Sequence, residues 1–501
     1  MFTHTLPTLC LAAALAAPPA AGKYAVLVDP GPGDAFLPAA RALADFHQAS
    51  LHRFDPAQLD DAFAELKKLR PEFVAFVLPP EKIDVDLAHA VLERSTRLDD
   101  DPFCDFEYGF VTGRDGPAAL RFVEHIKQAW RRDYARKVTM FGSWEGFFAP
   151  PAQPLTAFKA LKADAEARFV QTRDDEAGRR KTAREALANC KGKDLLLFFS
   201  HGYPDEMAGC FRAKDLRDWN VDLTSAVLVN CACYNGAPGR WFAPGPGGVA
   251  DRGVVARDDS VCLAVLDSGV AGYFAGIDPW HGPLAMQVSG YVFDDGLRLG
   301  AAAKMMHDRL ALDFLPGRIH FEPALRKPDR FAGEGVSNRR HNGAGMILYG
   351  DPAFAPFAKS ASRLGFAELK TGDGQKCELR LGTRPLLDGS PGVDFMIPQN
   401  RLFDYYSIKS ADFLKELALE VYRVLPLPPG VDRVPALRVK SARSGSKEVP
   451  TGPVQAVVEA TPAGHRLHVR VPLAVRGADP TWALAIAKDG VTVELAGEFG
   501  R

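Results

Sequence analysis

A histidine and a cysteine each follow a short apolar run of the kind that forms a buried strand. The run Leu195–Phe199 is followed by one serine and His201, and the run Ala226–Val229 leads into Cys233. An imidazole can take up a proton, and a thiol is a strong nucleophile once it has lost one. Together the two residue types predict nucleophilic catalysis by a thiolate, provided that the fold brings them together.

Two parallel strands would place these side chains at one edge of a sheet. In an open α/β sheet, ligands and catalytic groups gather at the carboxyl ends of the strands. Gly202 and Gly236 follow the histidine and the cysteine closely. Glycine lets the backbone turn sharply and approach a substrate, which fits the same interpretation.

Other interpretations of these residues are weaker but stay open. A metal site made of Cys231, Cys233 and His201 lacks a second Cys-x-x-Cys pair or a His-x-x-x-His pair nearby. A serine nucleophile lacks the Gly-x-Ser-x-Gly turn that such enzymes use. Taken singly, the histidine fits an ordinary hydrogen-bonded residue and the cysteine an inert buried thiol.

The first two thirds of the chain alternate between apolar runs and helical patterns. Such alternation predicts a mostly parallel sheet with helices on both faces, here ending at about Pro356. The predicted strands are Tyr24–Val28, Phe73–Leu78, Val138–Phe141, Leu195–Phe199, Ala226–Val229 and Val270–Phe274. The predicted helices are Leu37–Phe46, Ala57–Leu69, Leu87–Leu92, Ala118–Trp130 and Glu176–Ala188. The most apolar stretch, Val261–Ile277, predicts a strand, a turn and a second strand.

Beyond about Ala358 the pattern changes to period two, which is typical of half-buried strands. The alternating segments are Cys377–Leu381, Arg466–Val471 and Val491–Leu495. Asp489-Gly490 follows the apolar run Trp482–Ala487 and predicts a hairpin turn, whereas Asp412–Tyr422 has a helical pattern. We therefore expect a small antiparallel β-sandwich domain after the α/β part.

Composition and charge exclude several classes of protein. The chain of 501 residues is 47% hydrophobic, and its 61 basic and 62 acidic residues leave a net charge of −1. This balance, without a long basic block, argues against nucleic acid or an anionic membrane surface as a partner. No stretch reaches the ~20 apolar residues of an integral membrane segment, and the hydrophobic content excludes intrinsic disorder.

The amino terminus predicts export. An apolar run over Leu6–Ala17 precedes the small residues Pro18–Gly22, the pattern of a signal peptide over residues 1–22. We therefore expect a secreted, periplasmic or cell-surface protein. The alternative is that these residues stay on the mature chain of an intracellular protein.

Cysteine usage does not resemble a disulfide scaffold. Seven cysteines follow the predicted signal peptide: Cys104, Cys190, Cys210, Cys231, Cys233, Cys262 and Cys377. An odd and sparse set leaves at least one thiol unpaired in the monomer.

Around the cysteine, the sequence resembles a known family. Ala232-Cys233-Tyr234-Asn235-Gly236, together with the Ser-His-Gly segment, resembles the signature of caspases, legumains and gingipains, and is most similar to gingipain-type cysteine peptidases. Met346–Pro352 is similar to the Gly-Asp-Pro strand that ends their catalytic domain, and Tyr108–Arg114 resembles a motif of their amino-terminal subdomain.

The resemblance implies a domain organisation. It corresponds to a caspase-like fold with an amino-terminal subdomain over 23–137 and a catalytic subdomain over 138–358. The segment 359–501 matches the immunoglobulin-like domain of these peptidases in kind only.

The same resemblance implies roles for individual residues. Cys233 would be the nucleophile and His201 the general base and acid, with Glu145 orienting the imidazole as the third member of a triad. The backbone N–H groups of Gly202 and Cys233 would form the oxyanion hole.

A substrate pocket is implied as well. Trp280 and Leu284 would line it, and Cys231 would face it. Gingipains that cut after arginine carry an aspartate in the stretch that corresponds to 147–161, which contains no acidic residue here. A preference for substrates with arginine or lysine therefore stays open, and Asp278 or Asp205 could take the place of that aspartate. Cys231 also has two other interpretations, as a disulfide partner of Cys233 and as a simple strand residue.

No cofactor is expected from these patterns. Calcium as a structural ion is an implication of the resemblance, although no loop has the ligand pattern of an EF-hand.

These observations predict a secreted cysteine endopeptidase that acts on proteins or peptides through a thioester. The alternative is a catalytically weak or inactive relative that serves as a surface or secretion-associated binding protein. A third interpretation is an intracellular scaffold with a caspase-like domain.

Overall fold

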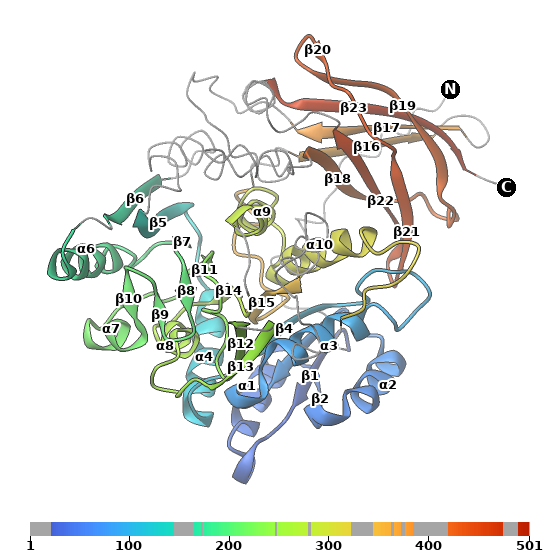
Figure 1. Ribbon diagram of the computed structural model, residues 1–501. Coiled ribbons are helices and arrows are strands. Elements are labelled where there is room, and N and C mark those ends of the chain that lie inside the picture. Colours follow the sequence, from blue (N-terminus) through green and yellow to red (C-terminus); the bar gives the residue numbers. More distant parts are fainter. Residues whose placement is uncertain are drawn as a thin grey trace.

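The computed structural model describes residues 22–144, 164–171, 174–245, 248–278, 282–321, 344–361, 365–371, 376–383, 419–473 and 489–499. Within these ranges the chain forms a large α/β part and two smaller antiparallel sheets (Figure 1). No helix of the described residues combines the length and the apolar character that crossing a membrane requires.

One sheet of ten strands organises the α/β part, in the order β2-β1-β3-β4-β15-β14-β11-β7-β5-β6. Its strands are β1 (Tyr24–Val28), β2 (Ser50–Arg53), β3 (Phe73–Val77), β4 (Glu107–Val111), β5 (Lys137–Trp144), β6 (Asp164–Gln171), β7 (Leu195–Phe199), β11 (Val227–Asn230), β14 (Gly272–Gly276) and β15 (Met346–Gly350). The strands pair in parallel on either side of β15. Strand β15 itself runs antiparallel to β14 and meets β4 through Tyr349 and Phe110.

Helices pack on both faces of this sheet. They are α1 (Leu37–His47), α2 (Leu59–Leu69), α3 (Val85–Ser95), α4 (Gly116–Ala129), α6 (Glu176–Ala188), α7 (Ala213–Asp218), α8 (Val261–Asp267), α9 (Gly282–Phe293) and α10 (Leu299–Leu312), with short 3-10 turns at Pro32–Asp34, Pro56–Gln58 and Pro80–Lys82. Alternate residues of β7 belong to different cores, since Leu196 is part of the buried cluster that includes residues of α6 and α8, and Leu197 is part of the one that includes residues of α9 and α10. A mostly parallel sheet flanked by helices is therefore confirmed.

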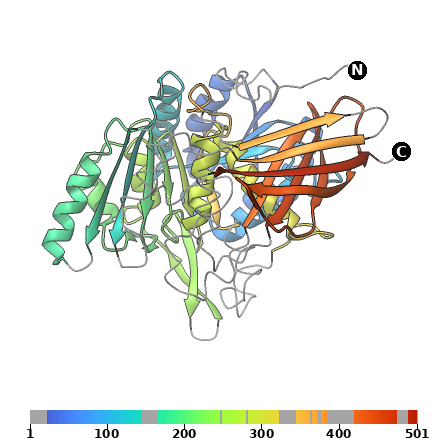
Figure 2. The ribbon, with the colours of Figure 1, turned by 90° about the horizontal axis from the view of Figure 1, so that it is seen from above.

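Two small sheets lie near the carboxyl edge of β7 and β11. One consists of β8 (Gly202–Tyr203), β9 (Glu206–Met207) and β10 (Phe211–Arg212). The other is the hairpin of β12 (Arg240–Gly245) and β13 (Gly248–Val254), which projects from the rest of the molecule in Figure 2.

The prediction for Val261–Ile277 is wrong in its first half. Val261–Asp267 forms helix α8, and Ser260 Oγ accepts a hydrogen bond from the N–H of Leu263 at its start. The helix is buried from Val261 to Leu266, so its sequence is apolar on every side and lacks the period that separates a helix from a strand. The strand that follows, β14, was predicted two residues too early.

The carboxyl-terminal part consists of two antiparallel sheets. One has the order β16-β17-β23-β19-β20 and the other β18-β22-β21. The strands are β16 (Gly365–Thr371), β17 (Lys376–Thr383), β18 (Leu419–Pro426), β19 (Pro435–Ser444), β20 (Lys447–Glu448), β21 (Gln455–Thr461), β22 (Gly464–Leu473) and β23 (Val491–Phe499). Side chains from both sheets, such as Leu379 and Val469, share one buried core.

The helix predicted over Asp412–Tyr422 is also wrong where it is described. Its last residues, Leu419–Tyr422, belong to strand β18, while 412–418 lie outside the described residues. Glu420 is buried, and two arginines pair with it. A charged residue at this buried position interrupts the alternation of apolar and polar residues by which a strand is recognised. The predicted run Trp482–Ala487 lies outside the described residues as well.

Helix α10 joins the α/β part to these sheets through buried ion pairs. Glu420 accepts hydrogen bonds from Nε of Arg309 on α10 and from Nε of Arg470 on β22, each at 2.7 Å. Arg470 also contacts Asp313, just after α10, at 2.5 Å. Buried charges of this kind tolerate separation poorly, because each would be left without its counter-charge.

Gly142 is required where β5 passes β7, the strand that leads to His201. A Cβ at Gly142 would lie 1.8 Å from the carbonyl oxygen of Phe199. We expect Gly142→Ala to lower the free energy of unfolding by about 3 kcal/mol or more, because the two strands would have to separate. Urea denaturation measures this loss.

Gly178 in helix α6 is the matched control. Its nearest neighbour would be Asp175 Oδ1, which caps the helix by accepting from the N–H of Gly178, at 3.1 Å from the new Cβ, so a small shift of that side chain relieves the contact. Gly178→Ala should change stability by no more than about 1 kcal/mol. Equal effects of the two substitutions would contradict the packing argument for Gly142.

Candidate active site

His201 and Cys233 follow neighbouring strands of the main sheet. Strands β7 and β11 pair in parallel from Leu195 with Val227 to Phe198 with Asn230. The pairing continues past β11, since the N–H of Cys231 donates to the carbonyl oxygen of Phe198 at 2.8 Å. The residues after both strands therefore leave the sheet at the same edge.

The backbone after the histidine packs directly on the cysteine segment. A Cβ placed at Gly202 would lie 2.8 Å from the carbonyl oxygen of Cys233 and 2.8 Å from Cβ of Ala232. Only glycine fits so close to another backbone. The structure thus brings together the two segments that carry His201 and Cys233.

The turn after the cysteine has an unusual backbone conformation. Tyr234 has φ of +60°, in the left-handed region that residues with a side chain seldom adopt. Two hydrogen bonds hold the backbone of Gly236. Its N–H donates to the carbonyl oxygen of Gly276 at 2.8 Å, and its carbonyl oxygen accepts from the hydroxyl of Tyr349 at 2.6 Å. A strained residue kept in place by its surroundings is a common feature of functional sites.

Asn235 connects the cysteine turn to the loop after the histidine. Its Nδ2 donates to the carbonyl oxygens of Tyr203 at 2.5 Å and Glu206 at 2.9 Å. Its Oδ1 accepts from Nδ2 of Asn230 at 3.1 Å. One buried amide therefore sets the position of one segment relative to the other.

Two further residues support this arrangement and were missed in the sequence. Asn230 Nδ2 donates to the Tyr273 hydroxyl at 2.9 Å, and that hydroxyl donates to the carbonyl oxygen of Asn235 at 3.1 Å. The only signal for Asn230 was a polar residue ending an apolar strand. Tyr273 lies on β14 and gave no signal, because its role depends on the pairing of β14 with β11.

Cys233 is the most accessible cysteine of the described residues. The described residues contain seven cysteines, all thiols, and every one except Cys233 is buried. Burial raises the pKa of Cys190 to about 12 and that of Cys377 to about 11. It raises the pKa of Cys104 and Cys262 as well, so these thiols stay protonated and unreactive near neutral pH.

Cys231 lies deeper than Cys233. It is 7% exposed and belongs to the apolar core that the sheet shares with α9 and α10. Of the two carboxylates considered for a basic substrate, Asp278 is buried and Asp205 is exposed.

Several predicted site residues lie beyond what the structure describes. Glu145 and Trp280 are outside the described residues, and of Leu284 only the backbone, in α9, is described. Close to Glu145 in sequence, Ser143 at the end of β5 is hydrogen-bonded to Ser200, their Oγ atoms 2.6 Å apart. Strand β5 thus ends beside the residue that precedes His201.

The predicted Gly-Asp-Pro motif belongs to a separate buried cluster. Asp351 accepts hydrogen bonds from Nε2 of His47 and Nε1 of Trp130, each at 2.8 Å, and from the hydroxyl of Tyr24 at 3.0 Å. Burial raises the pKa of Asp351, but the charge and hydrogen bond of His47 outweigh it and lower the pKa overall. The hydrogen bonds of Asp351 therefore connect the end of β15 to β1, to α1 and to the end of α4.

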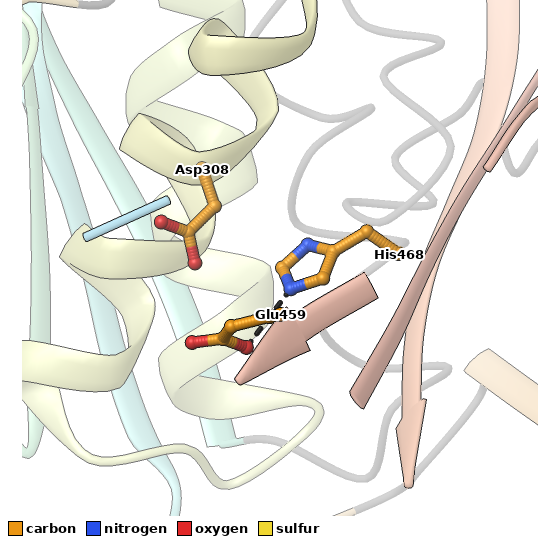
Figure 3. Close-up of side chains that lie close together, drawn as sticks. All are labelled: Asp308, Glu459 and His468. Atoms are coloured by element: carbon orange, nitrogen blue, oxygen red, sulfur yellow. Dashed lines mark hydrogen bonds and ion pairs between the residues drawn. The ribbon is translucent and has the colours of Figure 1, made fainter. Parts of the chain in front are cut away.

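Asp308, Glu459 and His468 form a second buried polar cluster, between α10 and strands β21 and β22 (Figure 3). Their ligand atoms lie within 4.8 Å of one another, close enough to suggest a metal site. However, Nζ of Lys304 lies 2.5 Å from Asp308 Oδ2 and 2.7 Å from Glu459 Oε1. An ammonium group already supplies the positive charge that a metal ion would bring, so these residues do not fit a metal site.

Comparison with known proteins adds little to this geometry. No protein-family model matches the chain, and no curated protein matches its sequence. A solved chain described as "Structure of Protease" is similar over 73% of this chain and 89% of its own, with 9% identity and a TM-score of 0.41. A likeness of that size carries no argument about fold or function.

Proposed function

We propose that the protein is a cysteine peptidase that hydrolyses peptide bonds at the edge formed by β7 and β11. Cys233 Sγ, as thiolate, attacks the carbonyl carbon of the scissile bond, and the amine leaves with a proton from the His201 imidazolium. The neutral His201 imidazole then takes a proton from the water whose oxygen attacks the thioester, so that the carboxylic acid is released and the Cys233 thiolate and His201 imidazolium are restored.

Backbone and neighbouring groups complete the proposed site. The N–H groups of Gly202 and Cys233 are proposed to stabilise the oxyanion, and the close packing of their segments supports this. Glu145 is proposed to orient the His201 imidazole, a role supported by the hydrogen bond between Ser143 and Ser200. Trp280 is proposed to line the substrate pocket.

The observation that carries the proposal is the packing of Gly202 on the Cys233 backbone. A Cβ added at Gly202 would lie only 2.8 Å from the carbonyl oxygen of Cys233. This packing joins the histidine and cysteine segments at the edge where α/β sheets keep their chemistry. The half-buried position of Cys233, among six other cysteines that are all buried, supports the same residue as nucleophile.

A peptide library assayed at neutral pH under reducing conditions tests the proposal. We expect cleavage of a subset of peptides, and loss of that cleavage when the protein is first treated with iodoacetamide. Absence of cleavage, or cleavage that survives alkylation, would refute a cysteine peptidase. Absence with intact fold would instead favour a binding protein that keeps the architecture.

Export is a separate part of the proposal and rests on residues 1–22 alone. If the chain is secreted, amino-terminal sequencing of protein from outside the cell should begin near Lys23. Recovery of the intact amino terminus only inside the cell would contradict it.

Asn235→Asp tests whether the buried amide positions the catalytic pair. The substitution replaces an N–H donor by a second oxygen facing the carbonyl oxygens of Tyr203 and Glu206, so the turn and the loop should move apart. We expect kcat/KM to fall by about 100-fold, the size expected for a displacement of roughly 1 Å.

The exposed Asn220 offers the same chemical change outside the site. Asn220→Asp should leave kcat/KM within about twofold of the wild type, since the side chain is on the surface. If both variants retained full activity, Asn235 would not be a positioning residue.

A further inference from the structure

Tyr203, two residues after His201, is unusually exposed for a large apolar side chain. Its exposed fraction is 48%, and among the described residues only Val254 and Val434 are other large apolar side chains with comparable exposure. Because single exposed apolar residues are common and only contiguous apolar patches mark binding sites, the neighbours of Tyr203 decide whether it forms part of one.

Two other rings connect Tyr203 to the segment that carries the nucleophile. Tyr203 meets Trp241 of β12 edge to face, with ring centroids 6.4 Å apart and planes at 70°. Trp241 in turn meets Tyr234, which follows Cys233, at 5.2 Å and 66°. Tyr234 is 5% exposed and supports the other two rings from the interior, so we call only Tyr203 and Trp241 the aromatic surface.

The aromatic surface is held in position by the backbone of the site. The carbonyl oxygen of Tyr203 accepts from Asn235, and that of His201 accepts from the N–H of Ala208 at 2.9 Å. Rigid aromatic side chains bind with little loss of conformational entropy. A substrate side chain that packs against Tyr203 would therefore be fixed relative to Cys233.

The charged residues next to these rings are mostly neutralised by one another. Arg240, which precedes Trp241, contacts Asp251 at 2.5 Å, and Glu206 contacts Arg212 at 3.4 Å. Such pairs leave little net charge to select a charged substrate. Asp205 remains exposed beside Tyr203 and is the basis of the rival preference for a basic side chain.

We propose that the aromatic surface is a specificity subsite that binds an aromatic or large aliphatic side chain of the substrate near the scissile bond. The proposal rests on the proposed peptidase function. Aromatic pairing adds to the burial of the substrate side chain, and the two effects together give a preference of roughly tenfold.

Paired peptides that differ in one residue beside the cleaved bond, phenylalanine or lysine, test the subsite. We expect the wild type to cleave the phenylalanine peptide at least about tenfold faster, measured as kcat/KM. Tyr203→Ala should reduce that ratio by about tenfold, and Val434→Ala, an exposed apolar residue on the carboxyl-terminal sheets, should leave it as in the wild type. Alkylation of Cys233 by iodoacetamide, measured alongside, reports whether the thiol is still activated.

The outcomes separate the subsite from the peptidase function itself. A preference for the lysine peptide that disappears in Asp205→Asn would overturn the subsite and leave the peptidase intact. An unchanged ratio in both Tyr203→Ala and Trp241→Ala would do the same. Failure to cleave either peptide, with alkylation of Cys233 independent of His201, would refute the peptidase function and the subsite together.

Discussion

Cys233→Ala is expected to lower peptide hydrolysis by at least about 10⁴-fold while the fold is retained. The reason is chemical, because no other described thiol can form the thioester: the remaining cysteines are buried, and burial raises the pKa of Cys190 to about 12. Removal of a nucleophile commonly costs a factor of this size or more. The measurement is kcat/KM on the best library peptide, with circular dichroism to verify the fold.

Cys231→Ala is the matched control for this prediction. Cys231 lies two residues away in the same segment, but it is buried in the core shared with α9 and α10. The substitution should reduce stability modestly and keep kcat/KM within about tenfold of the wild type. If Cys231→Ala were the inactive variant and Cys233→Ala the active one, the assignment of the nucleophile would be reversed.

Lys304→Met is expected to give the largest loss of stability. The ammonium group of Lys304 lies between Asp308 and Glu459, which are 2% and 3% exposed (Figure 3 shows both carboxylates). Without it, two carboxylates remain buried with less positive charge. Breaking a buried pair in this way costs about 3–5 kcal/mol, measured as the free energy of unfolding in urea at pH 7.

The effect of Lys304→Met should depend on pH in a defined direction. Burial raises the pKa of Glu459, but the charges of Lys304 and His468 outweigh it and hold the pKa well below its usual range. The wild type therefore has this stabilisation above about pH 4.3, the usual pKa of a glutamate, and loses it as the pH falls further. In the variant the buried carboxyls take up protons more readily. The difference in the free energy of unfolding between wild type and variant should therefore become smaller from pH 7 to pH 4.5.

The exposed pair of Lys440 and Glu378 serves as a control for this experiment. Its atoms are 2.6 Å apart, yet the side chains are 49% and 62% exposed. Lys440→Met should change stability by less than about 1 kcal/mol. A deficit in Lys304→Met that grew towards acid pH would contradict the described ionic cluster.

Much of the main sheet could be predicted because its strands are buried on both faces. Leu195–Phe199 reads as a continuous apolar run and forms β7 with the same bounds. The same property made the prediction for α8 wrong, since a fully buried helix is also apolar throughout. The prediction for β18 was wrong because of a buried charge, Glu420, which is stabilised by arginines far away in sequence.

The candidate site was only partly accessible to sequence reasoning. The end of the strand before His201 was predicted correctly and that of the strand before Cys233 to within one residue, because apolar runs indicate where strands stop. The supporting bonds were not, because Tyr273 reaches Asn235 only when β14 pairs with β11. The contacts of Lys304 likewise arise from packing of α10 on β21 and leave no local pattern.

The central claim is that His201 activates Cys233, and the pH dependence of Cys233 alkylation by iodoacetamide tests it most directly. Tryptic mass mapping follows the rate at pH 6 and pH 8 in the wild type and in His201→Ala. A thiolate paired with an imidazolium reacts at low pH, whereas an isolated thiol loses about tenfold in thiolate per pH unit below about 8.5. We expect the wild-type rates to agree within about tenfold and the His201→Ala rate at pH 6 to be about 100-fold below its rate at pH 8. Identical pH dependence in the two proteins would contradict the account.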